Sequence, residues 1–258
     1  MVIAIPDPDA PVRRPDPIKV AEVPTWRRLS LVAVIAALIH AQLYPIGEQL
    51  AARGAVIVPA TLRVVVLLGL LGYAIYQNAA SQRFVQIYDR VSRHLVVIAV
   101  LASMQLLTAQ RSLYLATATD VVLAIVAGAA YLRIHAGSHS RWIGLPFAVL
   151  AGYASFVAVG GLDASIALAG CPSIAPTIAL LLGLGMITMA LSLRASDPAL
   201  PALVGWLATT IVAADHAVTN VQGAALLAAG SCVATAGLIV MTRVVARAIP
   251  EPHRRSIR

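Results

Sequence analysis

Apolar residues along this chain gather into eight long runs, separated by short segments that hold most of the charged and turn-forming residues. Most runs approach or reach the roughly 20 residues that an α-helix needs to cross a bilayer. The pattern therefore predicts an all-α polytopic membrane bundle of eight transmembrane helices, over residues 29–47, 55–77, 94–109, 113–133, 143–160, 175–193, 199–218 and 222–243.

Two tails flank this predicted transmembrane domain, which spans residues 29–243. Residues 1–28 are rich in proline and carry charges of both signs, and proline blocks helix formation. We therefore expect an extended cytoplasmic tail at 1–28, with an interface anchor at Trp26-Arg27-Arg28, and a basic cytoplasmic tail at 244–258.

The composition points to the same class of protein. Hydrophobic residues make up 60% of the chain and charged residues only 12%, against about 45–50% and 25% in a soluble domain. The mean hydropathy is +0.86. A net charge of +8 suggests nucleic acid as the partner of a soluble protein, but here arginines in loops account for it. We expect an integral membrane protein whose partner is the lipid bilayer, with no nucleic acid.

The basic residues predict the orientation, because cytoplasmic loops carry an excess of Lys and Arg. Eight spans place both termini on one side. With the N-terminus in the cytoplasm, 16 of the 19 basic residues fall in inner segments, Arg53 and Arg111 fall outside, and Arg63 lies in the membrane. We therefore expect a multi-pass protein of the cytoplasmic (inner) membrane of a prokaryote.

Three connecting segments are predicted as loops. Residues 78–93 form a polar loop with room for a short interfacial helix, and a longer loop follows Gly160-Gly161. His135 and His139 fall in a solvated loop with no third ligand nearby, so we interpret them as surface residues.

Arg63 is the residue of this sequence that most needs an explanation. It lies inside the apolar run at 55–77, where a charged side chain costs roughly 2.5–3.5 kcal/mol on insertion scales. At 1.5 Å per residue it lies about 12 Å below the outer end of its helix. Another helix must supply a partner, and Asp120 and Asp215 are the candidates.

Polar side chains of other predicted helices lie at a similar depth. Five helices place polar groups in the outer half of the membrane, whereas the inner half of the bundle has almost none. The predicted set of ligand-binding or buried polar residues is Arg63, Asp120, Asp215, His216, His40 and Gln105.

Two interpretations of this set remain open. In the first, Arg63 pairs with Asp120 or Asp215 and locks the bundle, as interhelical polar contacts often do. In the second, the set lines a polar cavity near the outer surface that takes a ligand or a proton, because intramembrane ionisable residues mark functional sites. A path across the membrane needs polar stations at both depths, which disfavours a transporter or pump.

The sequence predicts no catalytic or metal site. Neither a P-loop nor a G-x-G-x-x-G motif is present, and Ser103 and Ser231 have no base at a plausible spacing. Cys171 and Cys232 are expected at different depths, and no Cys/His spacing is typical of a metal site. We therefore expect that the protein is not an enzyme.

Three segments resemble the longer bacterial members of the tryptophan-rich sensory (TspO/MBR-like) group. Residues 72–77, Gly-Tyr-Ala-Ile-Tyr-Gln, are similar to a GFxIYQ motif of that group, and residues 145–155 to its LPFxxYLGW segment. Residues 197–206 are similar to its DxxYxLVxxWA segment. The order and spacing agree over roughly residues 30–225, so the resemblance implies a common helical fold.

The resemblance also implies a class of ligand, because short members of the group bind porphyrins or sterol-like molecules. This chain departs from the group in having only three Trp, and Arg63 stands where the group tends to have an aromatic residue. The aromatic walls that hold a flat tetrapyrrole would then be missing. A tetrapyrrole or a lipid as cofactor is therefore implied less directly than the fold.

The leading prediction is a non-enzymatic, small-ligand-binding or sensor-like membrane protein that binds a hydrophobic small molecule in the outer-half pocket. The alternative is a structural or accessory subunit of a larger membrane complex. In that case Arg63, Asp120 and Asp215 only lock the bundle, and the tails contact the other membrane subunits. A transporter is the third prediction.

Overall fold

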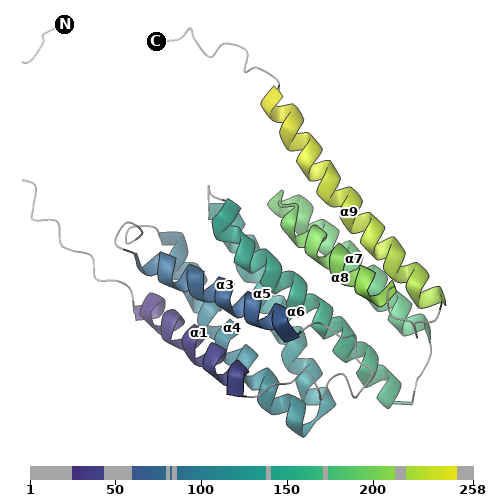
Figure 1. The fold of residues 1–258 in the computed structure, drawn as a ribbon, viewed down its shortest axis with the longest axis horizontal. Helices are drawn as coiled ribbons and strands as arrows, with labels where there is room; N and C mark the ends of the chain where they lie inside the picture. The colour runs from purple at the N-terminus through teal and green to yellow at the C-terminus, as the bar shows by residue number, and fades with distance from the viewer. Residues whose placement is uncertain are drawn as a thin grey trace, which may run out of the picture.

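The structure is a computed structural model that describes residues 25–43, 60–79, 82, 86–137, 141–170, 174–212 and 219–248. Within these residues the chain forms eight α-helices and no β-strand (Figure 1). The all-α class predicted from the sequence is thus confirmed for this part of the chain. The helices are α1 (Thr25–Leu43), α3 (Ala60–Asn78), α4 (Gln86–Arg111), α5 (Leu113–Gly137), α6 (Arg141–Leu168), α7 (Ile174–Ala195), α8 (Ala199–Val212) and α9 (Thr219–Ala248).

The helices lie side by side in two groups (Figure 1). One group consists of α1, α3, α4, α5 and α6, and the other of α7, α8 and α9. The groups meet where α6 contacts α7 and α8 and where α5 contacts α7, and we call this boundary the seam. The start of α1 lies beside the end of α3 and the start of α4. We call this end of the bundle the α1-start end.

Five helices are long and apolar enough to cross a membrane. Many of their large apolar side chains are exposed, as lipid contact requires, and Ile125 and Leu227 are each 67% exposed. Helix length and composition therefore support a multi-pass membrane protein. The five candidate spans are Tyr88–Ala109, Leu113–Ala136, Trp142–Leu168, Ile174–Ala195 and Asn220–Ala246, with shorter apolar helices at Leu62–Asn78 and Ala199–Ile211.

Two segments that the sequence predicts as loops are helical. α4 begins at Gln86, inside the predicted polar loop at 78–93. α6 continues through Gly160-Gly161 to Leu168, so the loop predicted there is wrong. Glycine is common inside transmembrane helices, which is why this pair does not end α6.

The outer helices also extend into both predicted tails. α1 begins at Thr25, inside the predicted tail 1–28, and α9 continues to Ala248, inside the predicted tail 244–258. The rest of both tails lies outside the described residues. The same holds for the predicted ends of the first and seventh spans, at 44–47 and 213–218.

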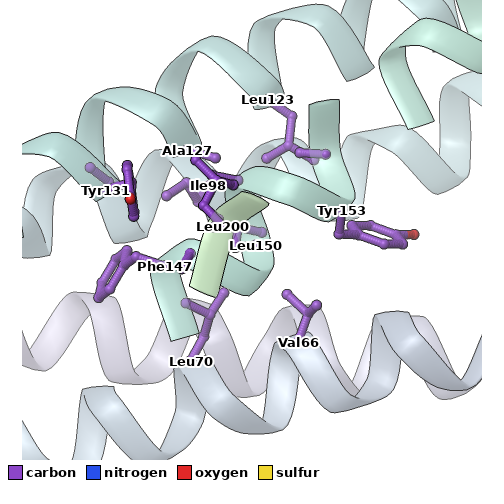
Figure 2. Close-up of a cluster of buried hydrophobic side chains, with 14 of the residues drawn as sticks. Val66, Leu70, Ile98, Leu123, Ala127, Tyr131, Phe147, Leu150, Tyr153 and Leu200 are labelled. Atoms are coloured by element: carbon purple, nitrogen blue, oxygen red, sulfur yellow. The ribbon is translucent and has the colours of Figure 1, made fainter. Parts of the chain in front are cut away.

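An apolar core fills the middle of the first group and reaches the seam (Figure 2). The rings of Tyr73 and Phe147 pack edge to face, with their centroids 4.7 Å apart. These two residues belong to the segments 72–77 and 145–155, so two of the three TspO/MBR-like segments contact each other. The core separates polar groups at the two ends of the bundle, and it includes Val66, Leu70, Ile98, Leu123, Ala127, Leu150 and Leu200.

Candidate functional site

Arg63 lies in the first turn of α3, at the end of the bundle opposite the α1-start end. Its Nη2 donates a hydrogen bond to the Ala102 carbonyl of α4, at 2.8 Å. Asp120 of α5 and Tyr153 of α6 lie within electrostatic reach of the guanidinium. Among the residues that the structure describes, however, no carboxylate forms a direct ion pair with Arg63. A backbone carbonyl, and not a counter-ion in contact, holds this charge.

Asp120 is buried early in α5, where it accepts a hydrogen bond from a different partner. The Nε2 of Gln105, near the end of α4, donates to Asp120 Oδ1 at 2.6 Å. Gln105 is also buried. A buried carboxylate without a donor is costly, and the Gln105 amide meets that need without bringing Arg63 into contact.

The structure therefore brings together three of the predicted site residues, Arg63, Gln105 and Asp120. We call these three residues and Tyr153 the Arg63 cluster. The sequence analysis missed Tyr153, because a tyrosine beside a glycine in an apolar helix is typical of packing. Its signal was depth: in the predicted spans 113–133 and 143–160, Asp120 and Tyr153 lie equally far from the outer end of their helices.

The other three predicted residues are placed differently. His40 lies in the last turn of α1, and its side chain is half-buried. Asp215 and His216 lie outside the described residues, so their membership of the site stays a prediction.

Further polar contacts join the helices at the same end of the bundle. Thr117 Oγ1 of α5 donates to the Gly161 carbonyl of α6 at 3.0 Å and lies 2.9 Å from Ser165 Oγ. Thr177 of α7 donates to Asp163 Oδ1 of α6 at 2.5 Å. The sequence analysis missed these contacts because it placed the end of α6, residues 161–168, in a loop. They extend the polar layer from α3 to α7.

The Arg63 cluster offers both kinds of hydrogen-bonding chemistry within an apolar bundle. The guanidinium donates, the carboxylate accepts, and the amide and phenol groups do both. These groups come from four helices, so they can surround one polar group of a ligand. In the described part of the chain, no three His, Cys, Asp or Glu side chains lie close enough together to hold a metal ion.

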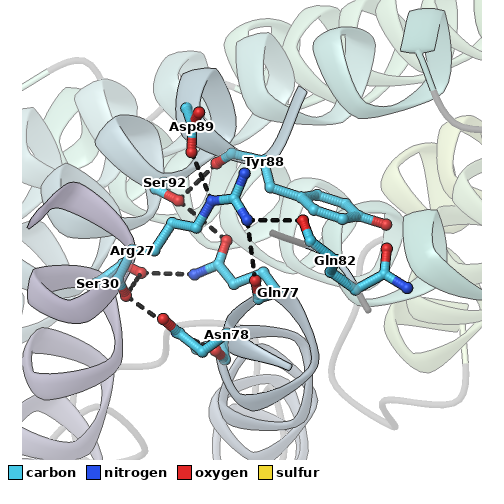
Figure 3. A network of polar contacts seen from close by, with 9 residues as sticks. Arg27, Ser30, Gln77, Asn78, Gln82, Tyr88, Asp89 and Ser92 are labelled. Carbon is cyan, nitrogen blue, oxygen red and sulfur yellow. Dashed lines mark hydrogen bonds and ion pairs between the residues drawn. The ribbon is translucent and has the colours of Figure 1, made fainter. Parts of the chain in front are cut away.

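A second buried arginine organises the α1-start end (Figure 3). Arg27 of α1 is fully buried, and its Nε donates to Asp89 Oδ1 of α4 at 2.5 Å. Its Nη1 donates to the carbonyls of Gln77 and Gln82, at 3.2 and 2.8 Å. The guanidinium carbon also lies 5.7 Å from the centroid of the Tyr88 ring. Arg27 thus ties three helices together through an ion pair, two carbonyls and an aromatic ring.

Side-chain amides complete this arrangement, which we call the Arg27 network. Gln77 of α3 donates from Nε2 to Ser30 Oγ at 2.6 Å and accepts from Ser92 Oγ at 3.0 Å. Asn78 donates to the Arg27 carbonyl at 3.1 Å. Both ends of the Gln77 amide are therefore bonded to neighbouring helices, and the network is closed.

These contacts correct two predictions about the α1-start end, which the predicted topology assigns to the inner half of the membrane. Arg27 is a buried interhelical residue, so its assignment to an interface anchor is wrong. The prediction that the inner half has almost no polar groups is also wrong, because Arg27, Gln77 and Ser92 are all buried. A signal was present in the sequence: Arg27 and Asp89 have opposite charges and flank helices predicted to start on the same side.

His135 is mostly shielded from solvent, although the sequence predicts a surface loop. It lies within α5, and its side chain is only 12% exposed. Its Nδ1 lies 2.8 Å from the carbonyl of Tyr131, and its Nε2 lies 3.3 Å from Asp197 Oδ2 in the turn between α7 and α8. The contact links α5 to the start of α8 across the seam.

Asp197 has one hydrogen-bonded carboxylate oxygen, Oδ1, while Oδ2 lies close to His135 without a hydrogen bond. Oδ1 accepts the backbone N–H of Ala199 at 3.1 Å and so caps the start of α8. Burial alone would raise the pKa of this carboxyl, but the His135 imidazole and the Ala199 amide hold it below its usual range. Asp197 is therefore ionised at neutral pH.

Comparison with known proteins adds no assignment to this picture. No protein-family model, curated protein or solved structure matches the chain. The resemblance to the TspO/MBR-like group therefore stays a prediction, and the functional argument depends on the residues themselves.

Proposed function

We propose that this chain is a non-enzymatic integral membrane protein that binds a small amphipathic molecule at the Arg63 cluster. One observation carries the proposal: Arg63 and Asp120 share a buried region without a direct ion pair. Opposite charges attract strongly in a low-dielectric interior, so a pair that only locked the bundle would be in contact. Their separation leaves hydrogen-bonding capacity for a third group.

The surroundings of the cluster define the class of ligand. One helical turn deeper, Val66 follows Arg63 on α3 and Leu123 follows Asp120 on α5, and both are core residues. A suitable ligand therefore has an ionisable or hydrogen-bonding head and an apolar body. Lipid-like and tetrapyrrole-like molecules, which the TspO/MBR-like resemblance implies, have this build, and the guanidinium favours an acidic head group.

The topology belongs to the same proposal. Eight crossings, with both termini in the cytoplasm, place 16 of the 19 basic residues on the inner side of the membrane. The α1-start end then faces the cytoplasm, and the Arg63 cluster lies in the outer half of the cytoplasmic membrane. A ligand would reach the cluster from the outer leaflet or from outside the cell.

Native mass spectrometry of the chain, extracted from its own membrane in mild detergent, tests the proposal. We expect the wild-type chain to carry an excess mass on the order of a few hundred daltons, the size of a pocket-bound small molecule. Arg63→Leu should lose this mass, because the head group loses its charged partner. Arg111→Leu is the matched control, because Arg111 is exposed near the same end of the bundle.

Two results would count against ligand binding. A wild-type chain without excess mass would overturn the proposal. A complex with other proteins that Arg63→Leu leaves intact would support the accessory-subunit alternative, in which the Arg63 cluster only joins helices.

A further inference from the structure

Three buried polar atoms at the seam lack a hydrogen-bond partner among the described residues. They are the Tyr131 hydroxyl of α5, the Ser192 hydroxyl of α7, and Oδ2 of Asp197. The three residues are 0%, 0% and 7% exposed. The Tyr131 hydroxyl lies within electrostatic reach of Ser192 and Asp197 but forms no hydrogen bond of ordinary geometry with either. Buried polar groups without partners are rare and require an explanation, and two of these residues, Tyr131 and Asp197, contact His135.

The partners of His135 determine where its protons lie. Nδ1 faces the Tyr131 carbonyl at 2.8 Å, and a carbonyl only accepts, so Nδ1 carries hydrogen. In the neutral ring Nε2 then has a lone pair, which faces Asp197 Oδ2 at 3.3 Å. Two acceptors in this position repel each other. The contact becomes attractive only when one more proton lies between Nε2 and the carboxylate.

That proton belongs to His135, because Asp197 is held in its ionised form. The carboxylate also accepts the Ala199 amide at the start of α8, and a helix N-terminus favours a negative charge. A protonated Asp197 would lose both stabilising interactions. A proton on Nε2 would therefore turn this 3.3 Å contact into an ion pair between an imidazolium and a carboxylate.

The other helices at the seam modulate this charge. From α5 and α7 the neighbours are the neutral Tyr131 and Ser192, and from α9 Arg243 lies within electrostatic reach of Tyr131. From α6 the neighbour is Gly144, where an added Cβ would lie 2.5 Å from the His135 ring. Arg243 disfavours a second positive charge and Asp197 favours it, and of these two charged groups Asp197 is the one within 3.3 Å of the His135 ring.

We propose that His135 and Asp197 form a proton-binding site that latches the two helix groups together. With the proton bound, α5 is tied to the start of α8. When the proton leaves, two acceptors face each other and the seam loosens. In the proposed topology this end faces the cytoplasm, so the latch responds to cytoplasmic pH. The apolar core separates the latch from the Arg63 cluster, so proton binding at the latch does not depend on ligand binding at the cluster.

The latch has two limits in pH. As the pH falls through the lowered pKa of Asp197, the carboxylate becomes neutral and its stabilising contribution is lost. When the imidazolium loses its proton, its attraction for the carboxylate is lost. The latch is therefore closed while His135 is protonated and Asp197 is ionised.

Nitrogen NMR of the full chain in detergent micelles, with ¹⁵N-labelled histidine, tests the site. His135→Gln assigns the signal. In Asp197→Asn the midpoint of the His135 transition should fall by about one pH unit, a roughly tenfold weaker proton binding. Asparagine is also a good N-cap, so α8 should keep its start. Equal midpoints in the wild type and in Asp197→Asn would overturn the proposal.

His94 is an internal control for this experiment. Its Nδ1 lies 2.9 Å from the carbonyl of Arg90, four residues earlier on α4, just as His135 faces Tyr131. In the described part of the chain no carboxylate contacts its ring. Its titration should not change in Asp197→Asn, and a shift of both histidines by the same amount would contradict a local site.

Hydrogen exchange tests the latch itself. Amides at the start of α8 should exchange faster above the His135 transition, beyond the intrinsic effect of pH on exchange. In His135→Gln this additional step should be absent, because glutamine does not titrate. A wild-type chain without the step would show that the proton does not control the seam.

Discussion

Arg27 and Arg63 are two arginines inside the same bundle, and they differ in how many partners surround their guanidinium groups. Arg27 has a carboxylate, two carbonyls and an aromatic ring around its guanidinium. Arg63 has one carbonyl, while its nearest described carboxylate, Asp120, is bonded to Gln105. A charge that only holds helices together needs its full set of partners from the protein. The incomplete set around Arg63 is therefore the reason why we propose ligand binding there and not at Arg27.

The position of the two arginines agrees with this difference. Arg27 joins the first turn of α1 to the end of α3 and the start of α4, where Asp89 is 38% exposed and keeps part of its hydration. Arg63 lies in the first turn of α3 and faces helices α4, α5 and α6. The Arg27 network thus joins helix ends at the α1-start end of the bundle, whereas the Arg63 cluster is formed by side chains of four helices.

Substitution of Arg27 should have the largest effect on stability. Arg27→Leu leaves Asp89 and two carbonyls without their donor. Breaking a buried charge pair costs about 3–5 kcal/mol, and we expect about 3 kcal/mol here because Asp89 is partly hydrated. The free energy of unfolding, measured by SDS titration and circular dichroism, checks this value. Arg28→Leu is the control, since Arg28 is exposed on the next position of α1 and its loss should be close to neutral.

The same substitution at Arg63 should be nearly neutral for stability. Arg63→Leu loses one hydrogen bond from a charged donor, about 1.5–3 kcal/mol, but removes a charge that costs about 2.5–3.5 kcal/mol in the membrane. We expect a net change within about 1 kcal/mol, measured as for Arg27. Arg63→Leu with Asp120→Asn should be equally stable and still lack the ligand. A loss as large as that of Arg27→Leu would identify Arg63 as a structural lock.

The helices were predictable because apolar runs of this length leave few alternatives to membrane spans. Arg63, Gln105 and Asp120 were predictable for the same reason, since a polar residue in an apolar run stands out. The wrong predictions lie where polar and apolar residues are not clearly separated along the chain. α6 continues past Gly160-Gly161 because backbone hydrogen bonds are retained inside a membrane helix, although the pair resembles a turn.

The interhelical contacts of the polar residues at the α1-start end could not be predicted, because these residues lie near the helix ends. Arg27, Asp89 and His135 lie where solvated charges are common, so composition does not distinguish a buried charge from an exposed one there. Their contacts follow from which helices are neighbours, and packing determines the contacts across α1, α3 and α4 and those across the seam. Tyr153 was missed because a tyrosine side chain also suits an apolar core.

The smallest predicted effect separates the closed network from ordinary helix contacts. Ser92 and Ser103 both lie on α4, and each donates to a carbonyl four residues earlier. Ser92 also donates to Gln77 Oε1 at 3.0 Å. Because one hydroxyl proton serves two acceptors, Ser92→Ala should cost only about 0.5–1 kcal/mol. Ser103→Ala should cost less, as it breaks no bond between helices. Equal unfolding free energies for the two variants would mean that the hydrogen bond from Ser92 to Gln77 adds nothing to stability. The Arg27 network would then not depend on Ser92.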